Sequence, residues 1–365
     1  MWLLYFFIGT FFYFSLLTIN TTKEKNGIYH KSLKVSAKKF FLFNVIFITI
    51  VISSLRLPVS DTVLYKSFFD TISNTNSFIT DIYFEPGYQI INKLTSLICD
   101  DFIFFLFFIN IFIWICFASF LKRYSLNLIY SFWLLLFLGY FDQTFNLLRQ
   151  YMAMAILLYS YKYVVNRSFG KFVVMTFIAM SFHASAIIFI LTYFIYNFKI
   201  KKTSSNIFIY LFLCAILFLL SNYIFKLLEL TPYAGYLTSK TWGVQEEVVK
   251  IAPIMNFCIL FIIIACYWIY NKFNDKTLNS IFTIVIIGSF MTILSFKFTP
   301  IGRVASYFSI FSVILLTNTI AQICNKRKRF LLYSFFFIIF LIKYIIVAYF
   351  RPDWASVYPY KFFFQ

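Results

Sequence analysis

Five ionisable side chains stand where an otherwise apolar sequence gives no simple structural reason for them. They are Glu85, Arg149, His183, Lys297 and Arg303. A carboxylate or an imidazole can act as a general base toward a hydroxyl group. Guanidinium and ammonium groups bind phosphate and stabilise the charge that develops on a leaving oxygen. Together these residue types can activate an acceptor hydroxyl and hold an anionic head group such as a diphosphate.

Two of the five have an ordinary structural alternative near a helix end. Glu85 precedes Pro86-Gly87, a turn signal, so it is expected at or beside the N-cap of an amphipathic stretch over 90–99. It is either a capping carboxylate or a general base at a cavity mouth. Arg149 is either a snorkelling side chain or, with Gln150 beside it, part of an inward polar stripe that binds phosphate.

The other three mark breaks in apolar runs. His183 lies in the polar interruption 181–185, where it is either a packing residue or a functional one. Lys297 and Arg303 flank a turn at 299–302, with Tyr307 one helical turn beyond Arg303. They form either an interfacial belt or, with Arg149 and His183, an outward-opening cationic cavity.

Composition shows which elements must position these residues. The 365-residue chain is 62% hydrophobic and only 12% charged, which excludes an ordinary soluble domain. Runs of about 20 apolar residues are long enough to cross a membrane. The sequence therefore predicts an all-α polytopic membrane protein with about ten full transmembrane helices, at 2–19, 40–55, 102–121, 126–141, 145–165, 206–225, 251–270, 278–296, 301–324 and 330–350.

The segment 172–198 is the exception, because basic residues flank it on both sides and a polar stretch interrupts it. A broken or re-entrant helical hairpin keeps both basic clusters on one face, with His183 at its turn. This topology places 20 of the 32 Lys and Arg residues in cytoplasmic segments, as the positive-inside rule requires. We expect a single integral-membrane domain over 1–365, with external loops at 56–101 and 226–250 and an external tail at 351–365.

The net charge of +19 is explained by this sidedness, so it does not indicate nucleic-acid binding. The six Cys residues fall in or beside apolar runs without a Cys-x-x-Cys spacing and are expected to act as small apolar residues. We expect no metal and no cofactor. Motifs for ATP hydrolysis, zinc proteolysis and nucleotide-sugar binding through a metal are missing from the sequence.

Six short motifs follow one another in a characteristic order. They are Arg56…Asp61…Tyr65, Glu85-Pro86-Gly87-Tyr88, Leu148-Arg149-Gln150, Ser181-Phe182-His183-Ala184-Ser185-Ala186, Gly302-Arg303…Tyr307 and Tyr358-Pro359-Tyr360. In their order and spacing they resemble the EpsG family of Wzy-like polysaccharide polymerases. The resemblance spans nearly the whole chain.

The resemblance implies a fold like that of C-type membrane glycosyltransferases and a place in the bacterial inner membrane, with the active site facing the periplasm or exterior. It implies transfer of a growing glycan from undecaprenyl diphosphate to the non-reducing end of a lipid-linked repeat unit of O-antigen, capsule or exopolysaccharide. The implied partners are this lipid-linked oligosaccharide, membrane lipid and a chain-length regulator protein.

The same resemblance, with the chemistry above, suggests a role for each candidate residue. His183 and Glu85 are the candidate catalytic residues, and either can be the base. Arg149, Arg303 and Lys297 are the candidate diphosphate ligands. The candidate glycan contacts are Asp61, Tyr65, Tyr88, Gln150, Tyr307 and Tyr358. An O-antigen ligase that uses the same donor, or a lipid-linked oligosaccharide flippase, is the alternative.

Overall fold

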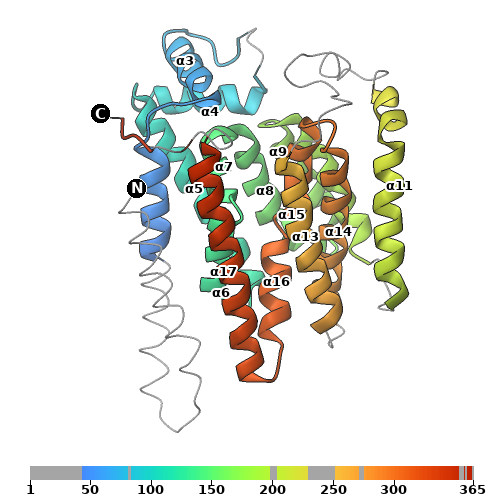
Figure 1. Ribbon diagram of the computed structural model, residues 1–365. Coiled ribbons are helices and arrows are strands. Elements are labelled where there is room, and N and C mark those ends of the chain that lie inside the picture. The colour runs from blue at the N-terminus through green and yellow to red at the C-terminus, as the bar shows by residue number, and fades with distance from the viewer. Residues whose placement is uncertain are drawn as a thin grey trace. The chain divides into compact units, whose positions relative to one another are not determined.

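The computed structural model describes residues 43–80, 84–197, 204–228, 251–270, 275–352, 357 and 360–363. These residues are almost entirely helical (Figure 1). The chain forms two compact units, one made of Met1–Tyr159, Phe177–Ala184 and Cys324–Gln365, the other of Ser160–Thr176 and Ser185–Ile323. The expected single domain over 1–365 stays a prediction.

The described part of the first unit begins with a helix at Phe43–Ser54. Its further helices are α3 (Asp61–Ser73), α4 (Pro86–Ser96), α5 (Phe102–Tyr124), α6 (Leu128–Phe137), α7 (Tyr140–Asn146), most of α8 (Leu148–Val165) and α17 (Lys326–Phe350). Side-chain caps fix several starts, since Asp101 accepts from Ile103 N–H at 2.8 Å at the start of α5 and Asn325 accepts from Lys328 N–H at 3.0 Å at the start of α17.

The second unit is built around α14. Its elements are most of α9 (Phe169–Met180), η1 (Ala184–Ile190), α10 (Leu191–Ile195), α11 (Ser204–Leu228), α13 (Ile251–Tyr270), α14 (Lys276–Leu294), α15 (Pro300–Ser309) and α16 (Ser312–Ala321). Helices α10, α11, α13, α15 and α16 all pack against α14. Asp275 caps α14 by accepting from Thr277 N–H at 2.8 Å.

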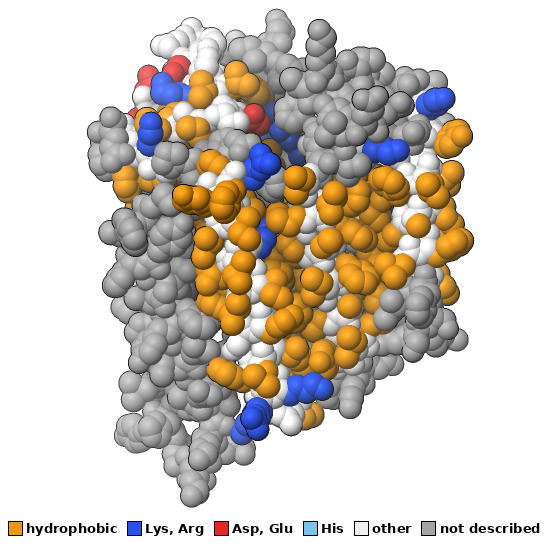
Figure 2. Space-filling view, in the orientation of Figure 1, with side chains coloured by type: hydrophobic (Ala, Val, Ile, Leu, Met, Phe, Trp, Pro, Cys, Tyr) orange, Lys and Arg blue, Asp and Glu red, His pale blue; other side chains and the backbone are white. Residues whose placement is uncertain are grey.

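Five helices in the described part of the chain are long and apolar enough to cross a membrane. They are α5, α13, α14, the run α15–α16 over Pro300–Ala321, and α17. The pair α6–α7, bent by 53°, makes a sixth if it forms one span. The protein is therefore a multi-pass, all-α membrane protein. Only 28% of the most apolar stretch of α17 is buried. The exposed face of this helix is hydrophobic, and its lower end in Figure 2 is basic.

The remaining predicted crossings are less complete. The described residues contain shorter apolar helices at Phe43–Ser54 and Ile209–Ser221, and α8 is not among the candidate spans. The predicted crossing at 2–19 lies outside the described residues. The count of ten crossings therefore stays a prediction.

The bend between α6 and α7 lies inside the predicted span 126–141. Gly139 has a φ of 91°, which a glycine adopts readily and other residues rarely do. The chain leaves α6 there and forms the seven-residue α7. Leu147 then separates α7 from α8, so Arg149 stands in the first turn of a new helix.

The broken hairpin expected at 172–198 is present. Helix α9 ends at Met180, and the chain resumes in η1 at Ala184 after a turn at 181–183. The two arms fold back on each other, because the ring centroid of Tyr193 lies 4.8 Å from that of Phe169 and 6.0 Å from that of Phe172. Each arm has 12 residues. The α-helical arm is about 18 Å long and the other, which is partly 3-10 helix, about 22 Å, so both are too short to cross a bilayer.

The predicted loop 56–101 is folded. Helices α3 and α4 pack on each other and lie at the same end of the first unit as residues 360–363 (Figure 1). Leu57 N–H donates to Lys361 O at 3.0 Å, and Phe363 N–H donates to Leu55 O at 3.2 Å. Helix α4 begins four residues before the predicted amphipathic stretch. The predicted loop 226–250 and much of the tail 351–365 lie outside the described residues.

Candidate functional site

Glu85 holds together two of the residues that the sequence singled out. Its Oε1 lies 3.1 Å from Nδ1 of His183 and accepts from the backbone N–H of Ala184 at 3.3 Å. Its Oε2 accepts a hydrogen bond from Arg149 Nη1, completing an ion pair. We call Glu85, Arg149 and His183 the carboxylate cluster. All three side chains are mostly buried, with 18%, 18% and 23% of their surface exposed.

The start of α4 and the hairpin tip bring the cluster together. Gly87 N–H, in the first turn of α4, donates to Ser181 O at 2.8 Å. A Cβ at Gly87 would lie only 2.8 Å from that same oxygen, so only glycine fits this approach. Glu85 occupies the N-cap position of α4, but its side chain makes no capping hydrogen bond. The capping interpretation of Glu85 is therefore wrong.

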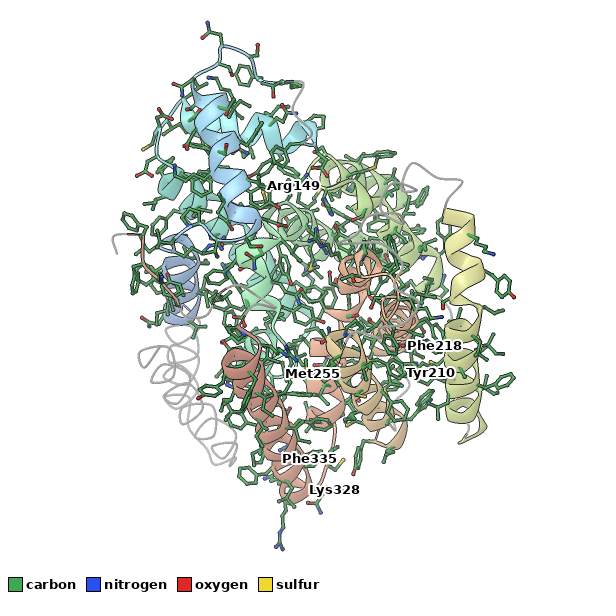
Figure 3. All side chains as sticks on the ribbon, turned by 45° about the horizontal axis from the view of Figure 1, so that its top comes forward. Arg149, Tyr210, Phe218, Met255, Lys328 and Phe335 are labelled. Carbon is green, nitrogen blue, oxygen red and sulfur yellow. The ribbon has the colours of Figure 1, made fainter. Side chains whose placement is uncertain are left out.

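Two aromatic rings, as well as Glu85, hold the side chain of Arg149 in place. Its guanidinium carbon lies 4.6 Å from the ring centroid of Phe84 and 5.7 Å from that of Tyr65. Its Nε is buried and has no hydrogen-bond partner among the described residues. Figure 3 labels Arg149 near the start of α4. Snorkelling alone does not explain this side chain, because it points into protein.

The neighbours of Glu85 keep it ionised. Burial raises the pKa of the carboxyl, but the hydrogen bond with His183 and the charge of Arg149 lower it by more, to about 2. A carboxylate can only accept hydrogen bonds. The nitrogen that faces it, Nδ1 of His183, must therefore carry a hydrogen, so Nε2 is the ring nitrogen that can take a proton from a hydroxyl.

Four further candidates lie in the first unit. Asp61 is the first residue of α3, and Gln150 is buried next to Arg149 in α8. Tyr65 and Tyr88 are buried, and their ring centroids lie 5.6 Å apart in the cluster that also contains Phe84. The ring of Tyr65 packs beside the guanidinium of Arg149, and both rings pack on Phe84. The candidate glycan contact Tyr358 lies outside the described residues.

Three candidates lie in the second unit, on or beside α15. Lys297 follows α14, and its Nζ lies 5.1 Å from the ring centroid of Phe218, which Figure 3 labels. Arg303 lies in the first half of α15, and its carbonyl accepts from Ser306 Oγ at 2.6 Å. Tyr307 is buried, and its hydroxyl accepts from Ser185 Oγ at 3.3 Å.

Sequence reasoning missed a charged pair inside the first unit. Lys343 of α17 donates to Leu138 O at 3.3 Å, at the bend between α6 and α7. It interacts electrostatically with Asp142 of α7, which is buried. A lone Lys within the apolar run 330–350 was the available signal, since such a residue usually has a buried partner.

The sequence assigned no role to Arg56 beyond its place in a motif. In the structure its side chain is buried. Its Nε donates to Ser53 O at 3.0 Å, and its guanidinium carbon lies 4.5 Å from the ring centroid of Phe145. Among the described residues no group of three or more His, Cys, Asp or Glu side chains can hold a metal ion.

Comparison with known protein families identifies the family of this chain. The model of the EpsG family matches residues 39–362, which is most of the chain. No curated protein and no solved structure matches.

Proposed function

Because the chain belongs to the EpsG family, which is linked to exopolysaccharide biosynthesis, we propose that it is a glycosyltransferase that polymerises repeat units of a surface polysaccharide. It transfers a growing glycan from undecaprenyl diphosphate to the non-reducing end of a lipid-linked repeat unit. The reaction takes place at the outer face of a bacterial cytoplasmic membrane. The observation that supports this most directly is the carboxylate cluster.

The reaction needs a base for the acceptor hydroxyl. In our proposal Nε2 of His183 takes the proton of the acceptor hydroxyl as its oxygen bonds to the anomeric carbon of the donor sugar. The bond from that carbon to the diphosphate oxygen breaks, and the diphosphate leaves with the electron pair. Glu85 orients the imidazole and stabilises the imidazolium that forms, by its contact with Nδ1 at 3.1 Å.

The leaving diphosphate needs fixed positive charge. A guanidinium has five N–H donors; Arg149 donates to Glu85 from Nη1 and also hydrogen-bonds Tyr65, and its Nε is buried. The remaining donors can bind a phosphate oxygen while Glu85 still holds the side chain. We assign Arg149, Arg303 and Lys297 to the diphosphate. In a poorly solvated site these cations can replace a metal ion.

The remaining candidates recognise the glycan or support the site. We keep Asp61, Gln150, Tyr307 and Tyr358 as glycan contacts. The ring of Tyr65 lies beside the Arg149 guanidinium, and the rings of Tyr65 and Tyr88 both pack on Phe84, so we assign these two residues the support of Arg149 and Glu85. A chain-length regulator protein remains a proposed partner.

Deleting the gene in its host and separating the surface glycan on a gel tests the function. A ladder that collapses to a single repeat unit supports a polymerase. Lipid-linked polymer that accumulates without transfer supports a ligase. Single units that accumulate on the cytoplasmic face support a flippase, and either of these last two results overturns the proposal.

Two variants then test the site in the complemented strain. His183→Asn keeps a donor where Nδ1 faces Glu85 but removes Nε2, so we expect the ladder to be lost although the protein still folds. Arg149→Ala should also abolish long chains. Asp70→Asn is the matched control, because Asp70 is an exposed carboxylate that pairs with exposed Lys66 on the same helix. If His183→Asn and Arg149→Ala both left long polymer at normal abundance, the assigned roles would be wrong.

A further inference from the structure

Helix α4 turns its polar side chains inward and its apolar side chains outward. The inward face consists of buried Tyr88, Gln89, Asn92, Lys93 and Thr95. The outward side exposes Ile90 and Leu94 of the helix, and Leu97 and Ile98 directly after it, at 38%, 44%, 64% and 72%. These four positions are spaced i, i+4, i+7 and i+8, so they form one stripe. We call it the α4 stripe.

The inward polar face is satisfied by hydrogen bonds. Gln89 Oε1 accepts from Thr80 N–H at 2.8 Å, and Asn92 Nδ2 donates to Tyr88 O at 2.7 Å. The Lys93 ammonium lies at the C-terminal end of α3, where it donates to Ile72 O and Ser73 O at 3.2 Å each and to Thr75 O. The inverted polarity is therefore built into the fold.

An apolar stripe of this kind is unfavourable in water and favourable in lipid. The position of α4 in the chain indicates which surroundings it has. Ile98 lies four residues before Phe102, the first residue of the candidate span α5. Four extended residues reach at most about 14 Å. The end of α4 therefore lies close, in depth along the membrane normal, to the first residue of α5.

The exposed apolar surface continues into α5 itself. Beyond exposed Asp100 and Asp101, the side chains of Phe108, Ile111, Phe112 and Ile115 are exposed along one face of that helix. A pair of acidic residues between two apolar stripes fits the polar head-group layer, whereas apolar residues on both sides fit contact with acyl chains.

We propose that α4 lies in the membrane interface, on the face where α5 begins, with the α4 stripe in contact with the acyl chains of the outermost part of that leaflet. Because the stripe runs from Ile90, in the second turn, to Ile98, just past the end of the helix, the helix axis lies near the membrane plane, and its two ends lie at similar depth. Glu85, next to Pro86 at the other end, is then held at head-group level. This inference does not depend on the proposed enzymatic activity.

Photolabelling of the unmodified chain in liposomes tests the inference. The probe is phosphatidylcholine with a diazirine on its acyl chain, and labelled peptides are identified by mass spectrometry. We expect residues 90–98 to be labelled at a level similar to residues 108–115 and several times more than residues 66–73 of α3, which expose Lys66, Asp70 and Thr71. Label on 108–115 without label on 90–98 overturns the proposal.

Spin labelling separates the other possible neighbours of the stripe. A nitroxide at Leu94→Cys, in a chain whose six native cysteines are replaced, should collide often with oxygen and rarely with a water-soluble nickel chelate. The matched control Thr71→Cys should show the opposite. Frequent collision with nickel at position 94 would show that the stripe faces water, and low collision with both would show that protein covers it, from a second copy or a partner. Either result overturns the proposal. Photolabelling tests it even if the cysteine-free chain does not fold.

Discussion

Replacing Gly87 by alanine tests whether the contact between α4 and the hairpin tip sets the geometry of the carboxylate cluster. An alanine Cβ would overlap Oγ of Ser181 and would lie 2.8 Å from its carbonyl oxygen and 3.0 Å from its Cβ. The hydroxyl can rotate away. The carbonyl oxygen cannot, because it accepts the hydrogen bond from Gly87 N–H at 2.8 Å. Reaching an ordinary contact of 3.4 Å requires the two segments to separate by about 0.6 Å.

This displacement acts on Glu85 and His183, which belong to the two segments that separate. Catalytic groups must be held within about 0.5 Å of their productive positions, and a misplacement of about 1 Å can cost about a hundredfold in rate. We expect Gly87→Ala to lower the rate of chain extension by roughly ten- to a hundredfold. Overpacking of this kind costs about 1–3 kcal/mol of stability, so the protein should still fold.

The assay is extension of a purified lipid-linked repeat unit by the protein in liposomes, with melting temperature measured alongside. Gly170→Ala is the matched control, since a Cβ there meets nothing within 4 Å. Adding Ser181→Ala to Gly87→Ala removes the hydroxyl contact but leaves the carbonyl contact, so activity should not be restored. Wild-type rates for Gly87→Ala, or full rescue by Ser181→Ala, would refute the reasoning.

Three further predictions concern charged groups. Folding lowers the pKa of Glu85 from 4.5 to about 2, so the ionised carboxylate adds stability that is complete above pH 4.5 and is lost as the pH falls to 2. The melting temperatures of wild type and Glu85→Gln should therefore converge at the acidic end of this range. A difference that stays constant with pH would contradict this prediction. Lys343→Met leaves buried Asp142 without its cation and should lower the free energy of unfolding by about 3–5 kcal/mol. In the same denaturation assay, adding Asp142→Asn should recover most of this loss, and no recovery would show that the two residues are not coupled. Lys93→Met removes the ammonium that binds the last carbonyls of α3 and should speed proteolysis of the 56–101 segment, while Lys66→Met, which breaks only an exposed ion pair worth less than about 1 kcal/mol, should not.

The sequence identified individual residues of the site better than it identified their contacts. Glu85, Arg149 and His183 could each be singled out because an ionisable group in an apolar context is costly. Their contacts join residues 64 and 98 positions apart in the chain, and such pairings depend on tertiary packing that no local pattern records. For the same reason the sequence could not choose between Glu85 and His183 as the base.

The elements show the same division. Basic flanks and a polar interruption were enough to predict the hairpin at 172–198. The bend at Gly139 was not predicted. The apolar run 126–141 continues without interruption from α6 into α7, and the sequence does not show that Gly139 adopts a φ of 91°. In α4 the periodicity predicted two unlike faces, but periodicity alone does not say which face is buried. The inward face proved to be the polar one.

Stability does not explain why the chain keeps three ionisable groups in the carboxylate cluster. Removing a carboxylate and a guanidinium from water costs several kcal/mol for each ion, and the attraction between them often repays no more than that. The surrounding rings of Tyr65, Phe84 and Tyr88 show that aromatic packing was available at this position. Apolar residues of similar volume in place of Glu85 and Arg149 would hold α4 on α8 about as well. What they could not supply is an imidazole oriented by a carboxylate next to a guanidinium, and that arrangement is the one that our proposed transfer from a diphosphate carrier would use.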